Sequence, residues 1–198
     1  MCGHITPVET RTKFVILMHP KELKKTKNGT GRLTHLSLPN SEIHVAIDFS
    51  DHRRVNDLID DPSNTCYVLY PGNTSINLNT TPIGSKAKNT VIFLIDSTWP
   101  CSKKILRLSA NLAKLPRVSF ESDRLSQFKI KQQPKDYCLS TIESTLCVLE
   151  LLNRQQSESI APEKLESFLN PFEAMVDYQL ERIDTEDKNA VRFRPRQP

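Results

Sequence analysis

The stretch VIFLI, residues 91–95, is apolar at every position and is followed directly by Asp96. A short apolar run without alternation is typical of a parallel strand that is covered by helices on both faces. The next residues, Ser97 to Trp99, are polar and aromatic, and a cationic segment with helical spacing begins behind them. This order of strand, polar loop and helix predicts an α/β fold built on a mostly parallel sheet flanked by helices.

Similar patterns along the chain predict the other elements. Strands are expected at residues 13–18, 43–49, 66–70 and 117–120, and helices at residues 31–38, 51–61, 101–112, 140–152 and 162–183. The lysine-rich residues 21–27 are expected to form a loop, and Pro171 is expected to kink or break the last helix. Ser140 and Glu143 form an S-x-x-E capping box at the start of their helix.

Length and hydropathy narrow the class of protein. The 198 residues suffice for a sizeable core, and we expect one domain over the whole chain with a basic tail at residues 184–198. No apolar run reaches the roughly 18 residues of a membrane span, and the N-terminus lacks the apolar core of a secretory signal. These features favour a cytoplasmic protein without membrane association.

The cysteines and histidines form no recognisable metal or catalytic pattern. The five cysteines contain no C-x-x-C pair, and the five histidines have no metal spacing and no G-x-S-x-G serine beside them. Buried thiols are the simplest interpretation of most cysteines. Zinc hydrolysis and serine catalysis therefore find no support.

The net charge is only +4, but the cations are clustered. The clusters are Lys21, Lys24, Lys25, Lys27 and Arg32; Lys103, Lys104 and Arg107; and Arg192, Arg194 and Arg196. Such clusters suit a polyanion such as nucleic acid, although an ordinary solvated surface carries the same residues.

Two loops are expected side by side at one edge of the sheet, because ligands of open α/β sheets bind beyond the carboxyl ends of the strands. They are Pro71-Gly72 and the segment from Asp96 to Trp99. Asp96 lies beside the amides that open the next helix, where it serves a ligand or merely caps the helix. Trp99 offers an indole face to a cation or a flat ring, or fills the core. Residues 29–32 (GTGR) resemble a glycine loop whose backbone amides hold an anion. They lack the lysine and spacing of a Walker loop and the third glycine of a dinucleotide fingerprint, so a plain turn is the expectation.

Five separated motifs occur in the order in which the DTW-domain family has them. They are GTGRL at 29–33, LYP at 69–71, DSTW at 96–99, RLSQFKI at 124–130 and STIES at 140–144. The chain therefore resembles this family over residues 2–152. The resemblance implies a SPOUT-like fold with a C-terminal knot and the activity of a tRNA-uridine aminocarboxypropyltransferase. Such an enzyme moves the 3-amino-3-carboxypropyl group of S-adenosylmethionine to the ring imino nitrogen of a uridine in tRNA and releases methylthioadenosine.

The resemblance also implies roles for individual residues. Asp96 is the expected catalytic residue, as the base for the uridine proton or as the anchor of the cofactor's α-amino group. The residues expected to bind the cofactor are Leu69, Tyr70, Pro71, Ser97, Thr98, Trp99, Ser140, Thr141 and Glu143. The cations that we assign to the tRNA backbone are Arg32, Lys103, Arg107 and Arg124.

One departure from the family concerns metal. Relatives carry a zinc-binding group of cysteines near the N-terminus, and only Cys2 stands in a plausible final position here. A tetrahedral zinc site needs about four ligands. Either the native chain begins upstream of Met1 or this member works without the metal, and we expect no zinc and no protein partner.

Two other functions fit the same motifs. SPOUT-type proteins commonly transfer the methyl group of the same cofactor, and a DTW domain without catalysis would be an RNA-binding module. The cofactor by-product separates the first from the expected reaction, and tight cofactor binding argues against the second. Related enzymes act on ribosomal RNA, whereas the intact Asp-Ser-Thr-Trp pattern and the short, acidic-poor tail favour tRNA.

Overall fold

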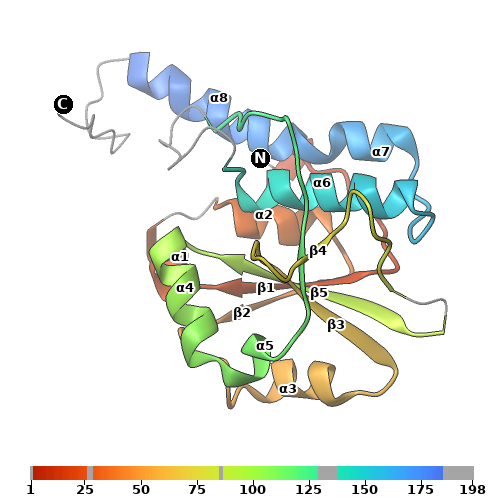
Figure 1. Ribbon diagram of the computed structural model, residues 1–198. Coiled ribbons are helices and arrows are strands. Elements are labelled where there is room, and N and C mark those ends of the chain that lie inside the picture. The colour runs from red at the N-terminus through yellow and green to blue at the C-terminus, as the bar shows by residue number, and fades with distance from the viewer. Residues whose placement is uncertain (1, 26–28, 85–86, 129–137, 185–198) are drawn as a thin grey trace.

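The computed structural model describes residues 2–25, 29–84, 87–128 and 138–184. In chain order its elements are η1 (Cys2–His4), β1 (Lys13–Met18), α1 (Pro20–Lys25), α2 (Thr30–Ser37), β2 (Ser41–Val45), α3 (Arg53–Asp60), β3 (Asn64–Leu69), β4 (Ile76–Asn77), β5 (Asn89–Asp96), α4 (Trp99–Leu108), α5 (Ala110–Ala113), β6 (Arg117–Ser119), α6 (Thr141–Arg154), α7 (Pro162–Glu166), η2 (Ser167–Leu169) and α8 (Asn170–Asp184). The strands form one sheet in the order β2-β1-β5-β3-β6-β4, with parallel neighbours throughout the described residues. The predicted α/β class is therefore confirmed (Figure 1), while the C-terminal knot remains a prediction.

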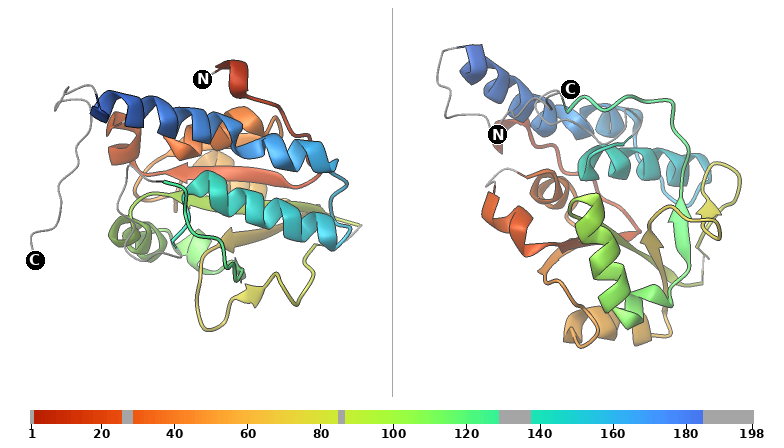
Figure 2. Two further views of the ribbon diagram at one scale, coloured as in Figure 1. Left: turned by 90° about the horizontal axis from the view of Figure 1, so that it is seen from above. Right: turned by 60° about the vertical axis from the view of Figure 1, so that its left-hand side comes forward.

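Helices cover both faces of the sheet. Figures 1 and 2 show α2, α6, α7 and α8 on one side and α3, α4 and α5 on the other. Alternate side chains of β1 pack into two separate cores. Phe14 and Ile16 pack beneath the first group of helices, and Val15 and Leu17 pack beneath the second. All four side chains are fully buried, which explains why the strand shows no polar alternation.

The strands β1 and β5 are neighbours in the sheet, but the chain leaves them toward opposite faces. After β1 the chain passes through the short α1 to α2, whose Leu33 packs in the first core, and after β5 it enters α4, whose Ile105 packs in the second. Such a divergence opens a crevice at the carboxyl edge of a parallel sheet. The strands β3 and β5 also pair directly, so the loops after them lie side by side, as predicted.

The lysine-rich segment after β1 is the helix α1, so the prediction of a loop there was wrong. Pro20 occupies the first helical position, where its missing N–H costs nothing. The ring Nδ1 of His19 accepts a hydrogen bond from the Lys21 N–H at 3.1 Å, and the His19 carbonyl accepts one from the Glu22 N–H at 2.9 Å. The helix is short, which is why no apolar periodicity revealed it. Lys27 lies outside the described residues.

The helix predicted over residues 101–112 is two helices, α4 and α5, separated by Ser109. The cause is a contact with a distant loop: Ser109 Oγ accepts from the Phe49 N–H at 2.9 Å, and Ser50 Oγ donates to the Leu108 carbonyl at 3.0 Å. These bonds draw the chain away from the helical path and leave Leu108 38% exposed, although its spacing predicted a buried position.

Two other predicted boundaries differ from the structure. The strand predicted at residues 43–49 is β2, which begins and ends earlier, and Phe49 beyond it is fully buried in the second core. The helix predicted at residues 162–183 breaks at η2, directly before α8. Pro171 stands in the first turn of α8, where it is tolerated, rather than inside a continuous helix. Within the described residues no helix is long and apolar enough to cross a membrane.

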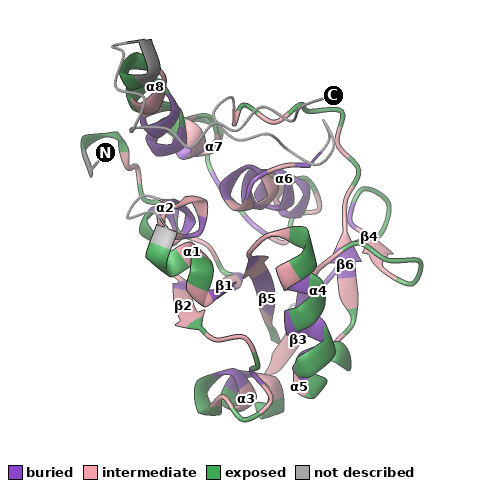
Figure 3. Ribbon diagram, turned by 90° about the vertical axis from the view of Figure 1, so that its left-hand side faces the viewer, coloured by how far each residue is buried: buried purple, intermediate pink, exposed green. Residues whose placement is uncertain are grey.

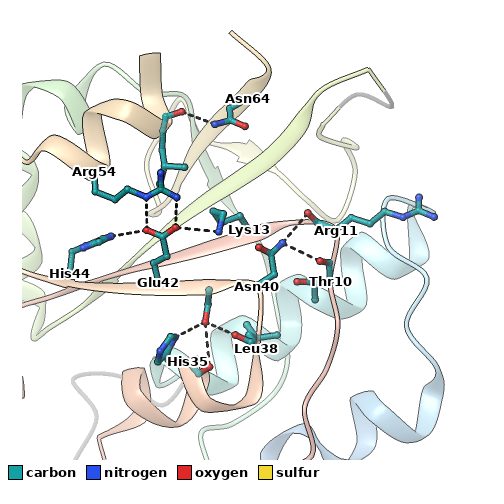
Figure 4. A network of polar contacts seen from close by, with 12 residues as sticks. Thr10, Arg11, Lys13, His35, Leu38, Asn40, Glu42, His44, Arg54 and Asn64 are labelled. Carbon is teal, nitrogen blue, oxygen red and sulfur yellow. Dashed lines mark hydrogen bonds and ion pairs between the residues drawn. The ribbon is translucent and has the colours of Figure 1, made fainter. Parts of the chain in front are cut away.

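An edge strand, β2, is tied to its neighbours by a network of charges around Glu42 (Figure 4). The Glu42 carboxylate accepts two hydrogen bonds from the Arg54 guanidinium, at 2.6 and 3.0 Å. Lys13 Nζ lies at 3.2 Å and His44 Nε2 at 3.0 Å from the same carboxylate. Chiefly because Arg54 stabilises the anion, the pKa of Glu42 is lowered from 4.5 to about 2.

Substituting Glu42 should therefore make stability less sensitive to acid. Because the pKa of the folded state lies below that of the unfolded state, the ionised carboxylate stabilises the fold above pH 4.5, and this contribution disappears between pH 4.5 and about pH 2. We expect Glu42→Gln to lower the free energy of unfolding by about 1–2 kcal/mol at pH 7, allowing for solvent screening, and by much less at pH 2.5.

Urea denaturation of both chains at several pH values measures this difference. The control is Glu163→Gln, which changes an exposed carboxylate on α7. A Glu42→Gln loss that is constant with pH would show that packing, and not the charge network, accounts for the effect.

Candidate active site

A cavity of about 650 Å³ opens at the carboxyl edge of the sheet, within the size range of small-molecule sites. Its wall is formed by the ends of β3 and β5 with the loops that follow them, the first turns of α2, α4 and α6, Glu22 on α1, and residues 118–120 and 128. Every residue that the sequence predicted to bind the cofactor lines this cavity, except Glu143. Asp96 and Arg32 line it as well.

Asp96 is the last residue of β5 and is only 7% exposed. Its position is set by the sheet, because it pairs with Met18 at the end of β1 and its carbonyl accepts the His19 N–H at 3.0 Å. The carboxylate Oδ1 accepts a hydrogen bond from Thr141 Oγ1 at 2.6 Å. The Asp96 side chain thus links the end of the central strand to the start of α6, and it does not cap α4.

The GTGR segment is not a plain turn but the start of α2, with Gly29 at the N-cap. Gly31 lies inside the helix and faces Asp96 so closely that a Cβ there would come within 2.6 Å of the Asp96 Cγ. A glycine inside a helix destabilises it by up to about 1 kcal/mol relative to alanine. The presence of Gly31 in a helical pattern was therefore the one local sign that another group lies close to the helix backbone there. Sequence reasoning missed this contact because nothing in the pattern names its partner.

The aromatic residues of the cavity wall come from two loops. Tyr70 follows β3 and Trp99 begins α4, and their rings meet edge to face with centroids 5.8 Å apart. The Arg117 guanidinium lies 5.6 Å from the centroid of the Tyr70 ring. Trp99 is 39% exposed, so it is not an ordinary core residue, and its ring belongs to the accessible wall of the cavity.

The first turn of α6 closes the opposite wall. The Glu143 carboxylate accepts the Ser140 N–H at 2.8 Å, as the predicted capping box requires. The same carboxylate accepts the Gln127 N–H at 2.7 Å and the Ser126 hydroxyl at 2.9 Å. Glu143 is 5% exposed and lies outside the lining of the cavity. Its contacts fix the connector beside the cavity onto α6.

Two buried hydroxyl groups of the cavity wall have no hydrogen-bond partner among the described residues. They are the Tyr70 hydroxyl and Ser140 Oγ. Ser140 faces the Glu143 N–H as a cap would, but none of its contacts in the described ranges meets hydrogen-bond geometry. Both oxygens are enclosed by protein, and a buried polar group without a partner costs about 1–3 kcal/mol.

The predicted RNA-binding cations fall into three environments. Arg32 is half-buried and lines the cavity. Lys103 and Arg107 are exposed on α4, whose outer side is open to solvent (Figure 3). Arg124 instead forms an ion pair with Glu150 of α6 at 2.8 Å, away from the cavity wall. The basic tail predicted at residues 184–198 lies outside the described residues except for Asp184, the last residue of α8. The end of the RLSQFKI motif also lies outside them.

Three of the described cysteines are buried. Burial raises the pKa of the Cys66 thiol to about 11, so it is protonated at neutral pH. Cys138 is buried in the cavity wall, and burial raises the pKa of Cys147. In the described ranges, no three histidine, cysteine or acidic residues are grouped so that they could hold a metal ion.

Comparisons of the sequence with family models and with curated proteins agree on one family. A family model described as the DTW domain matches residues 1–180. Three similar curated proteins are each called tRNA-uridine aminocarboxypropyltransferase 2. The Drosophila melanogaster protein is 29% identical over 180 residues, which cover 88% of this chain and 67% of that protein.

The other two relatives are longer. The Mus musculus protein is 29% identical over 180 residues, covering 89% of this chain and 58% of the relative. The Macaca fascicularis protein is 29% identical over 184 residues, covering 88% and 57%. The chain thus spans between a little over half and about two thirds of the length of these relatives. No solved structure matches the chain.

Proposed function

The chain belongs to the DTW-domain family, and from this premise we propose that it transfers the 3-amino-3-carboxypropyl group of S-adenosylmethionine to the ring imino nitrogen of a uridine in tRNA, in the cytoplasm. The observation that carries the proposal is the gathering of the family signature, residues 96–99, with residues 69–71 and the start of α6 around one cavity at the switch point of the sheet.

The cavity suits this cofactor in size and chemistry. Leu69, Leu94 and Val118 give it an apolar wall for a flat adenine ring. When bound, S-adenosylmethionine supplies an alkyl group on an electrophilic sulfonium. The backbone amides at the start of α6 are suited to hold its α-carboxylate, because a helix N-terminus attracts anions. The Trp99 ring offers its face to the sulfonium.

Asp96 is the residue that we assign to the reaction itself. A carboxylate at this position accepts the imino proton of the uridine as the nitrogen becomes a nucleophile, which is the work of a general base. The alternative role is to bind the α-amino group of the cofactor. In either role the Asp96 carboxylate acts inside a buried, preorganised site, where an electrostatic contact is stronger than in water.

The proposal is tested by the nucleoside that the protein makes. The full chain is incubated with S-adenosylmethionine and an unmodified tRNA transcript. The RNA is then digested, and the masses of its nucleosides are measured by mass spectrometry. The expected product is uridine that carries one aminocarboxypropyl group. A methylated nucleoside would contradict the proposal, and so would unmodified RNA from protein that binds the cofactor.

The exposed cations of α4 are expected to bind the tRNA backbone. Lys103 and Arg107 are one helical turn apart, and α4 begins at Trp99 in the cavity wall. We expect the Lys103→Ala and Arg107→Ala double variant to bind tRNA about 3- to 30-fold more weakly, and to lower the slope of log affinity against log salt by about 2, because each lost phosphate contact removes nearly one released counterion.

A filter-binding titration at several salt concentrations measures both quantities. The matched control is Arg154→Ala, which removes an exposed cation at the other end of α6 from the cavity. Equal losses in the control and the double variant would mean that tRNA does not contact α4 specifically.

A further inference from the structure

The Asp96 carboxylate is held from two sides by residues of two different helices. On one side, Thr141 Oγ1 donates a hydrogen bond to Oδ1 at 2.6 Å, a length typical of a strong bond to an ionised oxygen. On the other side lies Gly31, whose missing side chain leaves room for Oδ2 and Cγ. The carboxylate therefore occupies a slot between the first turns of α2 and α6.

The Gly31 side of the slot has no room for a side chain at position 31. A Cβ at position 31 would overlap Oδ2, lie 2.6 Å from Cγ and lie 3.1 Å from the Cβ of Asp96. The backbone of Asp96 cannot shift to relieve this overlap, because it is bonded into the sheet beside Met18 and buried at the strand end. Any side chain at position 31 must therefore turn the Asp96 carboxylate or push α2 outward.

The Thr141 side of the slot is equally fixed. Thr141 is the first residue of α6, and the next residue, Ile142, is fully buried in the first core together with Leu149 and Leu152. A helix anchored in this way holds its first side chain in one place. The hydroxyl of Thr141 points at Asp96, so its role is toward the carboxylate and not only toward a ligand.

We propose that Gly31 and Thr141 are positioning residues that set the place and the ionised state of the Asp96 carboxylate. This inference rests on the proposed function only in assigning Asp96 to the reaction. The hydrogen bond from Thr141 stabilises the ionised form of the Asp96 carboxyl relative to the protonated form. The space left by Gly31 keeps the Asp96 carboxylate in one orientation at the wall of the cavity.

Three variants test the inference. Thr141→Val keeps the shape and removes the donor, Thr141→Ser restores the donor, and Gly31→Ala fills the slot. The control is Thr145→Val, which removes a buried hydroxyl that donates to the Thr141 carbonyl at 2.7 Å in the same helix. Thermal denaturation checks the fold of each variant, and the three threonine variants suffice if Gly31→Ala does not fold.

The first readout needs no activity. Carbon-13 labelling of aspartate carboxyl groups allows the titration of Asp96 to be followed by NMR in the chain alone. We expect Thr141→Val to raise the pKa of Asp96, and Thr141→Ser and Thr145→Val to leave it near the wild-type value. His19 is bonded to the Asp96 backbone, and the same cavity wall contains the titratable groups of Glu22 and Cys138 and the permanent charge of Arg32. The difference between variants is therefore the informative quantity.

The second readout is the rate of group transfer. We expect Thr141→Val and Gly31→Ala to lower kcat about 10- to 100-fold with little change in the KM for tRNA, because misplacement of a reacting group affects the chemical step. Thr141→Ser should recover to within about threefold. If Thr141→Val matches Thr145→Val in both titration and kcat, the inference is wrong. Failure of the proposed function would give a different result. Asp96→Asn would then be as active as wild type, or no aminocarboxypropyl uridine would form. The NMR titration of Asp96 would still test the roles of Gly31 and Thr141.

Discussion

Replacing Asp96 with asparagine is expected to lower the rate of aminocarboxypropyl transfer about 10²- to 10⁴-fold, the usual contribution of a positioned proton acceptor. Asparagine has nearly the same shape, its side-chain oxygen still accepts the Thr141 hydroxyl, and the slot beside Gly31 still fits it. The fold should therefore survive, and the loss should appear in kcat. Steady-state kinetics with saturating tRNA and cofactor measure it.

The control for this substitution is Asp123→Asn, which changes an exposed carboxylate in the connector after β6. The same experiment separates the two roles open to Asp96. A base contributes to kcat alone, whereas an anchor of the α-amino group also contributes to cofactor affinity. Wild-type turnover in Asp96→Asn would remove Asp96 from the reaction altogether.

The second large effect is expected at Trp99. Trp99→Ala should weaken binding of S-adenosylmethionine about 10- to 100-fold, because it removes both a stacking surface and a cation–π contact. Stability should change little, since Trp99 is 39% exposed and its described ring contact is the single edge-to-face pair with Tyr70. Trp99→Phe should keep most of the affinity.

Calorimetry with two ligands makes this test specific. S-adenosylmethionine carries the sulfonium charge and methylthioadenosine does not, so a cation–π contribution requires a larger loss for the charged ligand. The matched control is Leu108→Ala, a similarly exposed apolar residue at the far end of α4, outside the cavity lining. Equal losses for the two ligands would reduce the role of Trp99 to stacking, and unchanged affinity would place the cofactor elsewhere.

The sequence was sufficient for the parts of the fold that follow from local periodicity. The unbroken run at residues 91–95 predicted a strand covered on both faces, and β5 lies at the centre of the sheet between two cores. The prediction that the loops after β3 and β5 lie side by side is also confirmed, because those strands pair directly. Together these predictions brought Tyr70 and Trp99 into one site.

The parts that could not be predicted depend on contacts between distant segments. The break in the α4–α5 pair arises from bonds between residues 49–50 and residues 108–110, two segments that meet only in the folded chain. The closeness of Gly31 to Asp96 likewise joins α2 to β5 across the switch point. A glycine inside a helix and a serine inside an apolar helical pattern were visible locally, but their partners were not.

The most direct test of the proposed function is the cofactor by-product. The full chain is incubated with S-adenosylmethionine, with and without unmodified tRNA, and the adenosine-containing products are separated by chromatography. Since the cofactor alone breaks down slowly to methylthioadenosine, the informative quantity is the part that depends on tRNA and on an intact Asp96. We expect methylthioadenosine to rise with tRNA and to match the uridines modified. S-adenosylhomocysteine in its place, or no tRNA-dependent product at all, would contradict the proposed reaction.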